Sequence, residues 1–419
     1  MAGEHVEVAR ALGLGLGVEE LARLLEAQQA LRAVVLVAQM DLLEAHEHDA
    51  AVDEGEADVA LQGCIMAPRS AEQPRGGRRL DQKAPAGAVA RLLSSLPFML
   101  AAYAARQDPD DPLSGLEVGE RPEPEVPPGW AAVTVRAASL NHHDLWSLRG
   151  VGLSEQALPM ILGCDAAGVD ADGDEVVVHG VIASETWRGD ETLDPKRSIL
   201  SERHQGAFAQ TVVVPRQNLV PKPAGLSFEH AACLPTAWLT AYRMLFTRAE
   251  ATPGATVLVQ GAGGGVATAA IALGAAAGVR VWATSRSEEK RARALELGAE
   301  QVFEPGARMP ERVDAVIETV GQATWGHSLR SLKPGGALVV SGATSGDAPS
   351  AELTRTFFLQ LRVLGSTMGS RDELARLVRL CASGAVTPVI DRTMPLADAR
   401  DGFAAMAAGD LFGKVVFTM

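Results

Sequence analysis

Cysteine and long apolar runs are both scarce in this 419-residue sequence. It contains four cysteines, and no two of them form a Cys-x-x-Cys pair. This spacing excludes a disulfide framework and a four-thiolate zinc knot built from neighbouring residues, and it favours a reducing compartment. No stretch reaches the roughly 18 uninterrupted apolar residues of a membrane-spanning helix. The first ten residues carry acids where a secretory signal carries a basic cluster. We therefore expect a cytoplasmic protein.

Basic residues are outnumbered, with 38 Lys plus Arg against 52 Asp plus Glu and a net charge of -14. An acidic surface repels nucleic acid and anionic lipid, so neither is expected as a partner. The hydrophobic fraction of 47% and the charged fraction of 21% are close to globular averages, which excludes disorder along the whole chain. At roughly 150 residues per domain, the length predicts two to three domains.

The N-terminal 98 residues differ from the rest. Residues 8–48 are rich in Ala, Leu and Glu at helical spacing, and residues 49–87 form a polar run with Gly and Pro. We predict an N-terminal extension over residues 1–98, helical and then a disordered linker, which is mobile and dispensable for activity. A helical appendage, an oligomerisation arm and translation from an upstream start remain alternatives for this segment.

The remaining sequence predicts an α/β protein in two parts. Residues 99–223 contain short β-branched runs bounded by turn residues, which predicts a mostly β domain. Residues 224–366 alternate predicted strands, such as 256–260 and 280–284, with helices, and Ser287 is placed to cap one of these helices. Repeated β-α units predict a parallel sheet that is wound on both faces.

A cluster of glycines lies between the predicted strand at 256–260 and the helix that follows it. Glycine lets the backbone approach a pyrophosphate closely, and the free N–H groups at a helix N-terminus favour an anion. A strand before the turn and a helix after it make this a dinucleotide-binding fingerprint. The residues expected to bind the dinucleotide are Ala262, Gly263, Gly264, Gly265 and Val266.

The end of the next strand selects between the two nicotinamide nucleotides. An acid there would bind a ribose 2′-OH and repel a 2′-phosphate. Instead the sequence has Ser285 and Arg286, with Lys290 one turn later. Because Arg286 can pair with a phosphate, the sequence predicts NADPH as the cofactor.

Six motifs in order resemble the medium-chain dehydrogenase/reductase superfamily, in its zinc-independent quinone oxidoreductase-like branch. They lie between Met99 and Met419, at residues 141–144, 163–168, 234–242, 261–267, 318–321 and 413–416. The resemblance implies a GroES-like catalytic domain over residues 99–223, completed by residues 367–419, and a Rossmann NADP-binding domain over residues 224–366. It also implies a homodimer or homotetramer.

Zinc-dependent members of this superfamily bind a catalytic metal at positions that match Asn141, Cys164 and Thr236. Of these, only Cys164 is a good zinc ligand, whereas the ion needs three protein ligands and an open position. The lobe with four closely spaced cysteines is missing as well. We therefore expect no metal, with an unusual site at His142, His143, Cys164 and Asp165 as the alternative.

The resemblance also places residues around the cofactor and the substrate. Asn141 is expected near the nicotinamide ribose, and Thr240 is expected to face the cofactor. Two short segments are expected to flank the nucleotide or the nicotinamide, and their residues are Val320, Gly321, Ser341, Gly342 and Ala343.

The proton donor is left open. Members of the branch often carry a tyrosine at the position of Trp146, and an indole cannot protonate an enolate. The remaining candidates are His142, His143 and a bound water, because a histidine pKa lies near neutrality. Asn141 and Asp144 complete the set of candidate catalytic residues. Asp144 is expected to order the loop more than to act as a base, and Tyr242 is expected to pack in the core.

Together these features predict an NADPH-dependent, zinc-independent oxidoreductase. Without a Lewis acid, hydride addition to a quinone or to a C=C bond conjugated with a carbonyl, as in enones and enoyl thioesters, is easier than alcohol oxidation. A zinc-type alcohol dehydrogenase and a nucleotide-binding protein without turnover are the alternatives. In the two enzyme hypotheses the partner is a small-molecule substrate.

Overall fold

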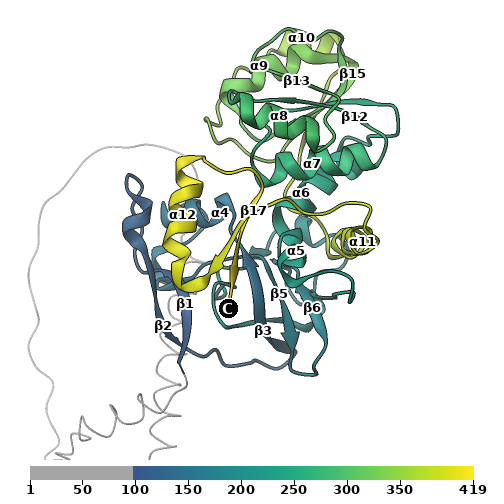
Figure 1. The fold of residues 1–419 in the computed structure, drawn as a ribbon. Coiled ribbons are helices and arrows are strands. Elements are labelled where there is room, and N and C mark those ends of the chain that lie inside the picture. The colour runs from purple at the N-terminus through teal and green to yellow at the C-terminus, as the bar shows by residue number, and fades with distance from the viewer. Residues whose placement is uncertain (1–97) are drawn as a thin grey trace, which may run out of the picture. The chain divides into compact units, whose positions relative to one another are not determined.

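The structure is a computed structural model that describes residues 98–419. The extension predicted for residues 1–98 lies outside the described residues, apart from residue 98. In Figure 1 the described chain runs from blue at its first strand to yellow at its C-terminus. Within residues 98–419, no helix combines the length and the apolar character that crossing a membrane requires.

Strands are found throughout the described chain. Their bounds are β1 (Phe98–Ala104), β2 (Leu116–Pro122), β3 (Trp130–Ser139), β4 (Met160–Ile161), β5 (Ala166–Asp170), β6 (Glu175–Val178), β7 (Val181–Ile182), β8 (Ser198–Ile199), β9 (Thr211–Pro215), β10 (Leu219–Pro221), β11 (Thr256–Val259), β12 (Arg280–Thr284), β13 (Gln301–Phe303), β14 (Val313–Glu318), β15 (Leu332–Val340), β16 (Arg362–Gly365), β17 (Ile390–Pro395) and β18 (Lys414–Thr418).

Helices are concentrated in the second half. Their bounds are α4 (His142–Leu148), α5 (Phe228–Ala232), α6 (Leu239–Tyr242), α7 (Gly265–Ala276), α8 (Glu288–Glu296), α9 (Gln322–Ser331), α10 (Leu353–Phe358), α11 (Arg371–Ala382) and α12 (Ala399–Ala408).

The first half of the described chain is mostly β, as the sequence predicts. Its largest sheet has the order β10-β6-β5-β3-β18-β17, and β9 also pairs with β3. Val133 and Val135 alternate with more exposed neighbours along β3 and lie in the core, which explains the period-2 pattern. The C-terminal strand β18, yellow in Figure 1, runs antiparallel to β3 with Val416 opposite Ser139. The end of the chain therefore completes a sheet that began near residue 130.

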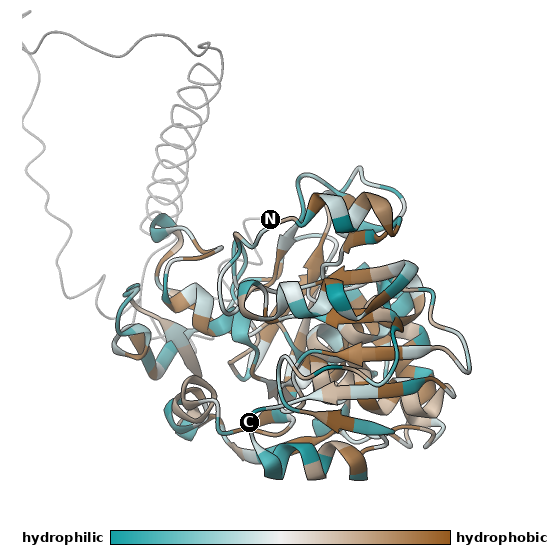
Figure 2. Cartoon of the chain, turned by 90° about the horizontal axis from the view of Figure 1, so that it is seen from above, coloured by the Kyte–Doolittle hydropathy of each residue, from teal (hydrophilic) through white to brown (hydrophobic). Residues whose placement is uncertain are grey.

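The second half contains a six-stranded sheet of order β13-β12-β11-β14-β15-β16, in which every neighbouring pair is parallel. All residues of β11 are buried, and Figure 2 shows the strands of this region mostly in brown, the colour of hydrophobic residues. The strand order reverses at β11, since β12 lies on one side of it and β14 on the other. In open parallel sheets, such a reversal leaves a crevice at the carboxyl ends of the strands, where ligands bind.

Small residues bring α7 close to this sheet. A Cβ added at Gly274 would lie 2.5 Å from a methyl group of Val281 on β12, so the helix approaches the strand too closely for a side chain. The following helix, α8, begins as predicted, because the hydroxyl of Ser287 accepts a hydrogen bond from the N–H of Lys290 (3.2 Å). The structure confirms the α/β fold class.

Candidate active site

The glycine turn connects β11 to α7 at the carboxyl edge of the parallel sheet. Gly261 has φ +96°, a conformation that favours glycine. Gly264 caps α7 with an ordinary φ of −75°, and a Cβ added there would meet no atom within 4 Å. The open space lies in front of the first N–H groups of a 12-residue helix, where an anion is stabilised. The turn therefore has the geometry of a pyrophosphate site.

Buried polar side chains stabilise the glycine turn through hydrogen bonds. The Thr284 hydroxyl accepts a hydrogen bond from the N–H of Gly261 (3.1 Å) and donates one to Oε1 of Gln260 (2.9 Å). Nε2 of Gln260 donates to the hydroxyl of Ser328 (3.0 Å) and lies 2.9 Å from Nδ1 of His327. The ends of β11 and β12 are thereby tied to α9. No local sequence pattern predicts these hydrogen bonds, because they pair residues up to 68 positions apart.

The tip of β12 presents the residues that are expected to select the nucleotide. Arg286 is exposed and Ser285 is half-buried. Lys290 lies across the glycine turn, and its Nζ donates a hydrogen bond to the carbonyl of Gly409 (2.7 Å). Arg286 is therefore the better placed of the two cations for a 2′-phosphate.

A buried carboxylate shapes the next segment of the crevice. Glu318, at the end of β14, is 0% exposed and accepts hydrogen bonds from the N–H groups of Val320 (2.8 Å) and Gly321 (3.0 Å). The hydroxyls of Thr324 and Ser328 donate to the same carboxylate. Glu318 thus fixes the path of the chain around Val320 and Gly321, and its role was not foreseen from the sequence.

The segment after β15 lies beside the Val320–Gly321 segment. The N–H of Ser341 donates to the carbonyl of Glu318 (3.0 Å). A Cβ added at Gly321 would lie 2.8 Å from Cα of Ala343, and one added at Gly342 would lie 2.9 Å from the carbonyl oxygen of Thr319. The structure therefore brings together the two segments that were expected to flank the cofactor.

Asn141 belongs to a buried network centred on Lys414 and Asp165. Nζ of Lys414 donates to Oδ1 of Asn141 (2.5 Å) and to the carbonyl of Leu140 (2.7 Å), and it lies 3.4 Å from Oδ2 of Asp165. Nδ2 of Asn141 donates to the same carboxylate oxygen (2.8 Å). Lys414 is 2% exposed and Asp165 is 0% exposed. The amide of Asn141 is therefore held at both ends by a buried ion pair.

The Asp165 carboxylate has two further donors. The Ser139 hydroxyl donates to Oδ2 (2.8 Å), and the Thr236 hydroxyl donates to Oδ1 (2.6 Å). Lys414 also packs against the start of α7, since a Cβ added at Gly265 would lie 2.8 Å from its Cδ. The network thus reaches from the mostly β part of the chain to the glycine turn. Lys414 lies in the motif at residues 413–416, and its role in this network was not predicted from the sequence.

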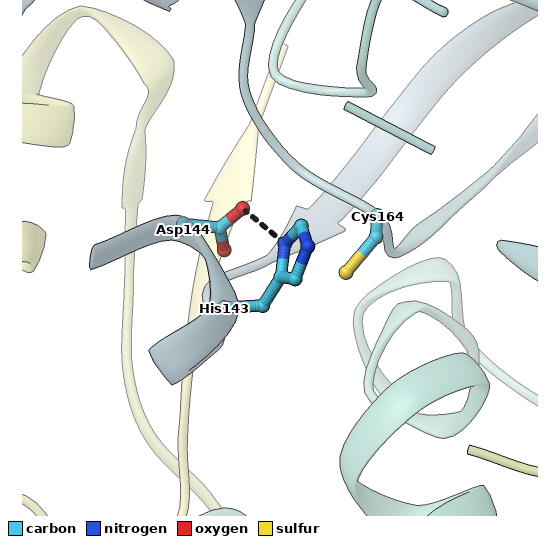
Figure 3. A group of neighbouring side chains, drawn as sticks. All are labelled: His143, Asp144 and Cys164. Carbon is cyan, nitrogen blue, oxygen red and sulfur yellow. Dashed lines mark ion pairs between the residues drawn. The ribbon is translucent and has the colours of Figure 1, made fainter. Parts of the chain in front are cut away.

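The two adjacent histidines lie in different surroundings. His142 is exposed, whereas the His143 side chain is 19% exposed and lies between the carboxylate of Asp144 and the thiol of Cys164, as Figure 3 shows. Nδ1 of His143 is 4.0 Å from Oδ1 of Asp144 and has no hydrogen-bond partner, and Nε2 is 3.3 Å from Oε1 of Glu202. Glu202 was not singled out from the sequence.

The groups around His143 control its protonation. Burial lowers the pKa of this imidazole, but contacts with Asp144, Cys164 and Glu202 outweigh burial and raise the pKa well above its usual value. Burial also raises the pKa of the Cys164 thiol. The neighbours of His143 therefore favour its protonated form, and burial favours the protonated thiol of Cys164.

Asp144 connects two segments of the main chain through hydrogen bonds. Its Oδ2 accepts a hydrogen bond from the N–H of Asn141 (2.9 Å) and its Oδ1 accepts one from the N–H of Gly163 (2.9 Å). Asp144 is 0% exposed, so it joins the start of α4 to the loop before Cys164. Tyr242 packs edge-on against Phe246 at a centroid distance of 5.1 Å, which agrees with the expected packing role.

Comparison with known proteins identifies the family. A model of the alcohol dehydrogenase GroES-like domain matches residues 127–224, and a model described as a zinc-binding dehydrogenase matches residues 265–383. A zinc-type alcohol dehydrogenase-like protein of Schizosaccharomyces pombe is 31% identical over 73% of this chain and 96% of its own length. The chain belongs to the medium-chain dehydrogenase/reductase superfamily. It is therefore an oxidoreductase, as the motifs predict.

Other relatives include reductases of unsaturated thioesters. The acryloyl-coenzyme A reductase of Metallosphaera sedula is 29% identical over 73% of this chain and 96% of its own length. Among solved structures, an NAD-dependent alcohol dehydrogenase has a TM-score of 0.71 and 34% identity, covering 77% of this chain and all of that one. The 2-octenoyl-CoA carboxylase reductase CinF, in complex with NADP and 2-octenoyl-CoA, has a TM-score of 0.72 and 26% identity, covering 79% of this chain and 90% of that one.

The superfamily's three zinc positions do meet in this structure. Sγ of Cys164 is 3.7 Å from Nδ2 of Asn141 and 3.3 Å from Oγ1 of Thr236. However, zinc takes thiolate, imidazole and carboxylate ligands, whereas this set offers an amide, a hydroxyl and a single thiol. The buried ammonium of Lys414 on Asn141 would also repel a dication. These three residues do not fit a zinc ion.

A second group of three, His143, Asp144 and Cys164, has ligand atoms within 4.8 Å of one another. Both carboxylate oxygens of Asp144 already accept main-chain hydrogen bonds. A metal ion there would have to share the Asp144 carboxylate with these two main-chain donors and remove the proton of a buried thiol. This group therefore does not fit a resident metal either.

Proposed function

We propose that this chain is an NADPH-dependent, zinc-independent reductase that transfers hydride to an activated C=C bond, with quinones as further acceptors. The observation that carries the proposal is the replacement of a metal-ligand set by the hydrogen-bonded network of Lys414, Asn141 and Asp165. A carbonyl without a Lewis acid is poorly polarised, which disfavours alcohol oxidation. Hydride addition to a conjugated C=C bond needs only hydrogen-bond donors, because the developing enolate is delocalised.

The relatives support an unsaturated thioester as the substrate class. One relative is named for acryloyl-coenzyme A, and a solved structural neighbour carries an enoyl-CoA together with NADP. The bound cofactor supplies the hydride. The remaining chemistry, which is to orient the substrate and to provide a proton, falls to residues of this chain.

Alcohol oxidation is the second candidate function. The similarity to an NAD-dependent alcohol dehydrogenase, at 34% identity, favours it. The tip of β12 argues for the phosphorylated cofactor instead, because Ser285 and Arg286 occur where an acid would bind an unphosphorylated ribose. The oligomeric state implied by the family resemblance stays a prediction.

The deciding experiment measures NADPH and NADH oxidation side by side with an enoyl-CoA, a small enone and a naphthoquinone, alongside the metal content of the purified protein. We expect steady turnover with NADPH and less than one zinc per ten chains. Stoichiometric zinc together with alcohol-dependent reduction of NAD would establish the second candidate. NADPH binding without turnover on any acceptor would establish a nucleotide-binding protein.

Arg286→Ala tests the cofactor preference. Loss of the guanidinium removes a charge-assisted contact with the 2′-phosphate, so we expect KM for NADPH to rise about tenfold or more, equivalent to at least about 1.4 kcal/mol. KM for NADH should stay within about twofold, since NADH has no such phosphate. Arg376→Ala removes another exposed arginine, on α11, and serves as the matched control. Equal effects of Arg286→Ala on both cofactors would contradict the assignment.

A further inference from the structure

We infer that Gln260, Ser328 and Glu318 are positioning residues that couple the two ends of the cofactor site. One end is the glycine turn at Gly261, and the other is the Val320–Gly321 segment. The inference rests on the proposed function and deepens it, because it states how this chain orders the site before NADPH binds. A path of hydrogen bonds runs between the two ends without a break.

The path begins at the main chain of the glycine turn. The N–H of Gly261 donates to the hydroxyl of Thr284 (3.1 Å), and that hydroxyl donates to Oε1 of Gln260 (2.9 Å). Nε2 of the same amide donates to the hydroxyl of Ser328 on α9 (3.0 Å). Because a hydroxyl has one hydrogen, Thr284 serves both neighbours only by accepting from Gly261 and donating to Gln260.

The path ends at the main chain of the Val320–Gly321 segment. Oε1 of Glu318 accepts hydrogen bonds from both N–H groups of that segment, at 2.8 Å and 3.0 Å, so the carboxylate is an acceptor there. The Ser328 hydroxyl donates to Oε2 of Glu318 (2.6 Å), which leaves its lone pairs to accept from Gln260. Each group along the path has one role toward each neighbour, and the hydrogen bonds therefore have a single arrangement.

A histidine fixes which end of the Gln260 amide faces α9. Nε2 of His327 lies 2.9 Å from the carbonyl oxygen of Ala307, and a carbonyl only accepts, so this nitrogen carries a hydrogen. Nδ1 of the same ring lies 2.9 Å from Nε2 of Gln260. In a neutral imidazole Nδ1 is then an acceptor, and it binds the NH₂ end of the amide. Gln260 is thereby held in the orientation that the path requires.

The path joins three strand ends at the carboxyl edge of the parallel sheet. Gln260 follows β11, Thr284 ends β12 and Glu318 ends β14, and Ser328 on α9 connects them. The proposed cofactor site uses the same edge, with the pyrophosphate at the glycine turn and the Val320–Gly321 segment beside the nucleotide. The cofactor therefore meets two segments that are already ordered together, which reduces the entropy lost on binding.

Burial makes the arrangement costly to disturb. Gln260 and Thr284 are 1% exposed, and Ser328 and Glu318 are 0% exposed, so water cannot replace a lost partner. A buried donor or acceptor without a partner costs more free energy than a hydrogen bond contributes. Breaking the path at one residue therefore leaves its neighbours on both sides unsatisfied, and they must move to find other partners.

Ser328→Ala breaks the path at its centre and is tested in the full chain without cofactor. We expect hydrogen–deuterium exchange to become about fivefold faster or more at both Gly261 and the Val320–Gly321 segment, because both ends lose their link to α9. Ser331→Ala is the matched control. Ser331 is also buried on α9, but its hydroxyl donates to the carbonyl of His327 in the same helix (2.8 Å). The control should keep exchange at both ends within about twofold of wild type.

NADPH affinity separates coupling from local damage. We expect Thr284→Val and Ser328→Ala each to weaken NADPH binding about tenfold, measured by fluorescence titration. The double variant should also be weakened about tenfold and not about 100-fold, because either change breaks the same path. Thr284→Ser keeps the hydroxyl and should bind NADPH within about twofold of wild type.

Three results would overturn the inference. They are faster exchange at one end only, a double variant whose loss of affinity is the product of the single losses, and equal effects of Ser328→Ala and Ser331→Ala. The exchange of Ser328→Ala decides the inference even where Thr284→Val does not fold. This measurement needs no cofactor, whereas a wild-type protein that binds no NADPH would overturn the proposed function.

Discussion

Gly264→Val is expected to abolish NADPH binding and to leave the fold intact. The backbone at Gly264 has φ −75°, which any residue adopts, and an added Cβ meets no protein atom within 4 Å. The same space lies in front of the first N–H groups of α7, where the pyrophosphate is expected. A valine side chain would occupy the space of the ligand and not that of the protein.

The expected loss of NADPH affinity is about 100-fold or more, equivalent to at least about 2.7 kcal/mol, measured by fluorescence titration. The melting temperature without cofactor should be unchanged within about 2 °C, because the substitution removes no contact. Gly225→Val is the matched control, since Gly225 is also exposed and an added Cβ there contacts only the Ala382 carbonyl oxygen at 3.7 Å. If Gly264→Val binds NADPH as tightly as the control variant does, the glycine turn is not part of the cofactor site.

Lys414→Met is expected to destabilise the fold by about 3–5 kcal/mol, since it leaves the Asp165 carboxylate buried without its cationic partner. Lys414 is 2% exposed and Asp165 is 0% exposed, so water cannot replace the ammonium. Asn141 also loses the donor to its Oδ1. Because methionine keeps most of the side-chain volume, the loss of stability measures the contribution of the Lys414 charge.

Urea unfolding of three variants measures this contribution. Lys333→Met breaks an ion pair of 2.8 Å whose partners are both 42% exposed, and it should cost less than about 1 kcal/mol. Adding Asp165→Asn to Lys414→Met removes the second charge and should recover part of the lost stability. Equal destabilisation by Lys333→Met and Lys414→Met would show that the buried pair contributes no more than a surface pair.

The local features of the proposed cofactor site could be predicted from the sequence. The predicted strand at 280–284 coincides with β12, and Ser287 caps α8 as expected. Each of these features depends on residues within a few positions of one another, through glycine backbone freedom, side-chain capping or hydrophobic periodicity. Such patterns can be recognised in a single sequence because they do not depend on contacts with residues that are distant in the chain.

The polar partners of the site could not be predicted in the same way. Glu202 is 59 positions from His143, and Lys414 is 273 positions from Asn141. No local pattern marks these pairs, since both depend on how distant segments meet. Lys414 begins β18, and it reaches Asn141 because β18 pairs with β3, whose end leads into α4.

By itself, the sequence determined the family, the α/β fold class and the glycine turn between a strand and a helix. Each of these depends on short-range spacing or on the order of motifs. Only the tertiary structure decided which of the two adjacent histidines lies between carboxylates: it is His143, near Asp144 and Glu202. It also decided that the buried ammonium of Lys414 binds Asn141, at a position where zinc-dependent members of the superfamily bind metal. The physical reason is that pKa values and ion pairs depend on burial and on distances through space. Residues that are far apart in the chain become buried together and come within contact distance only when the strands pair.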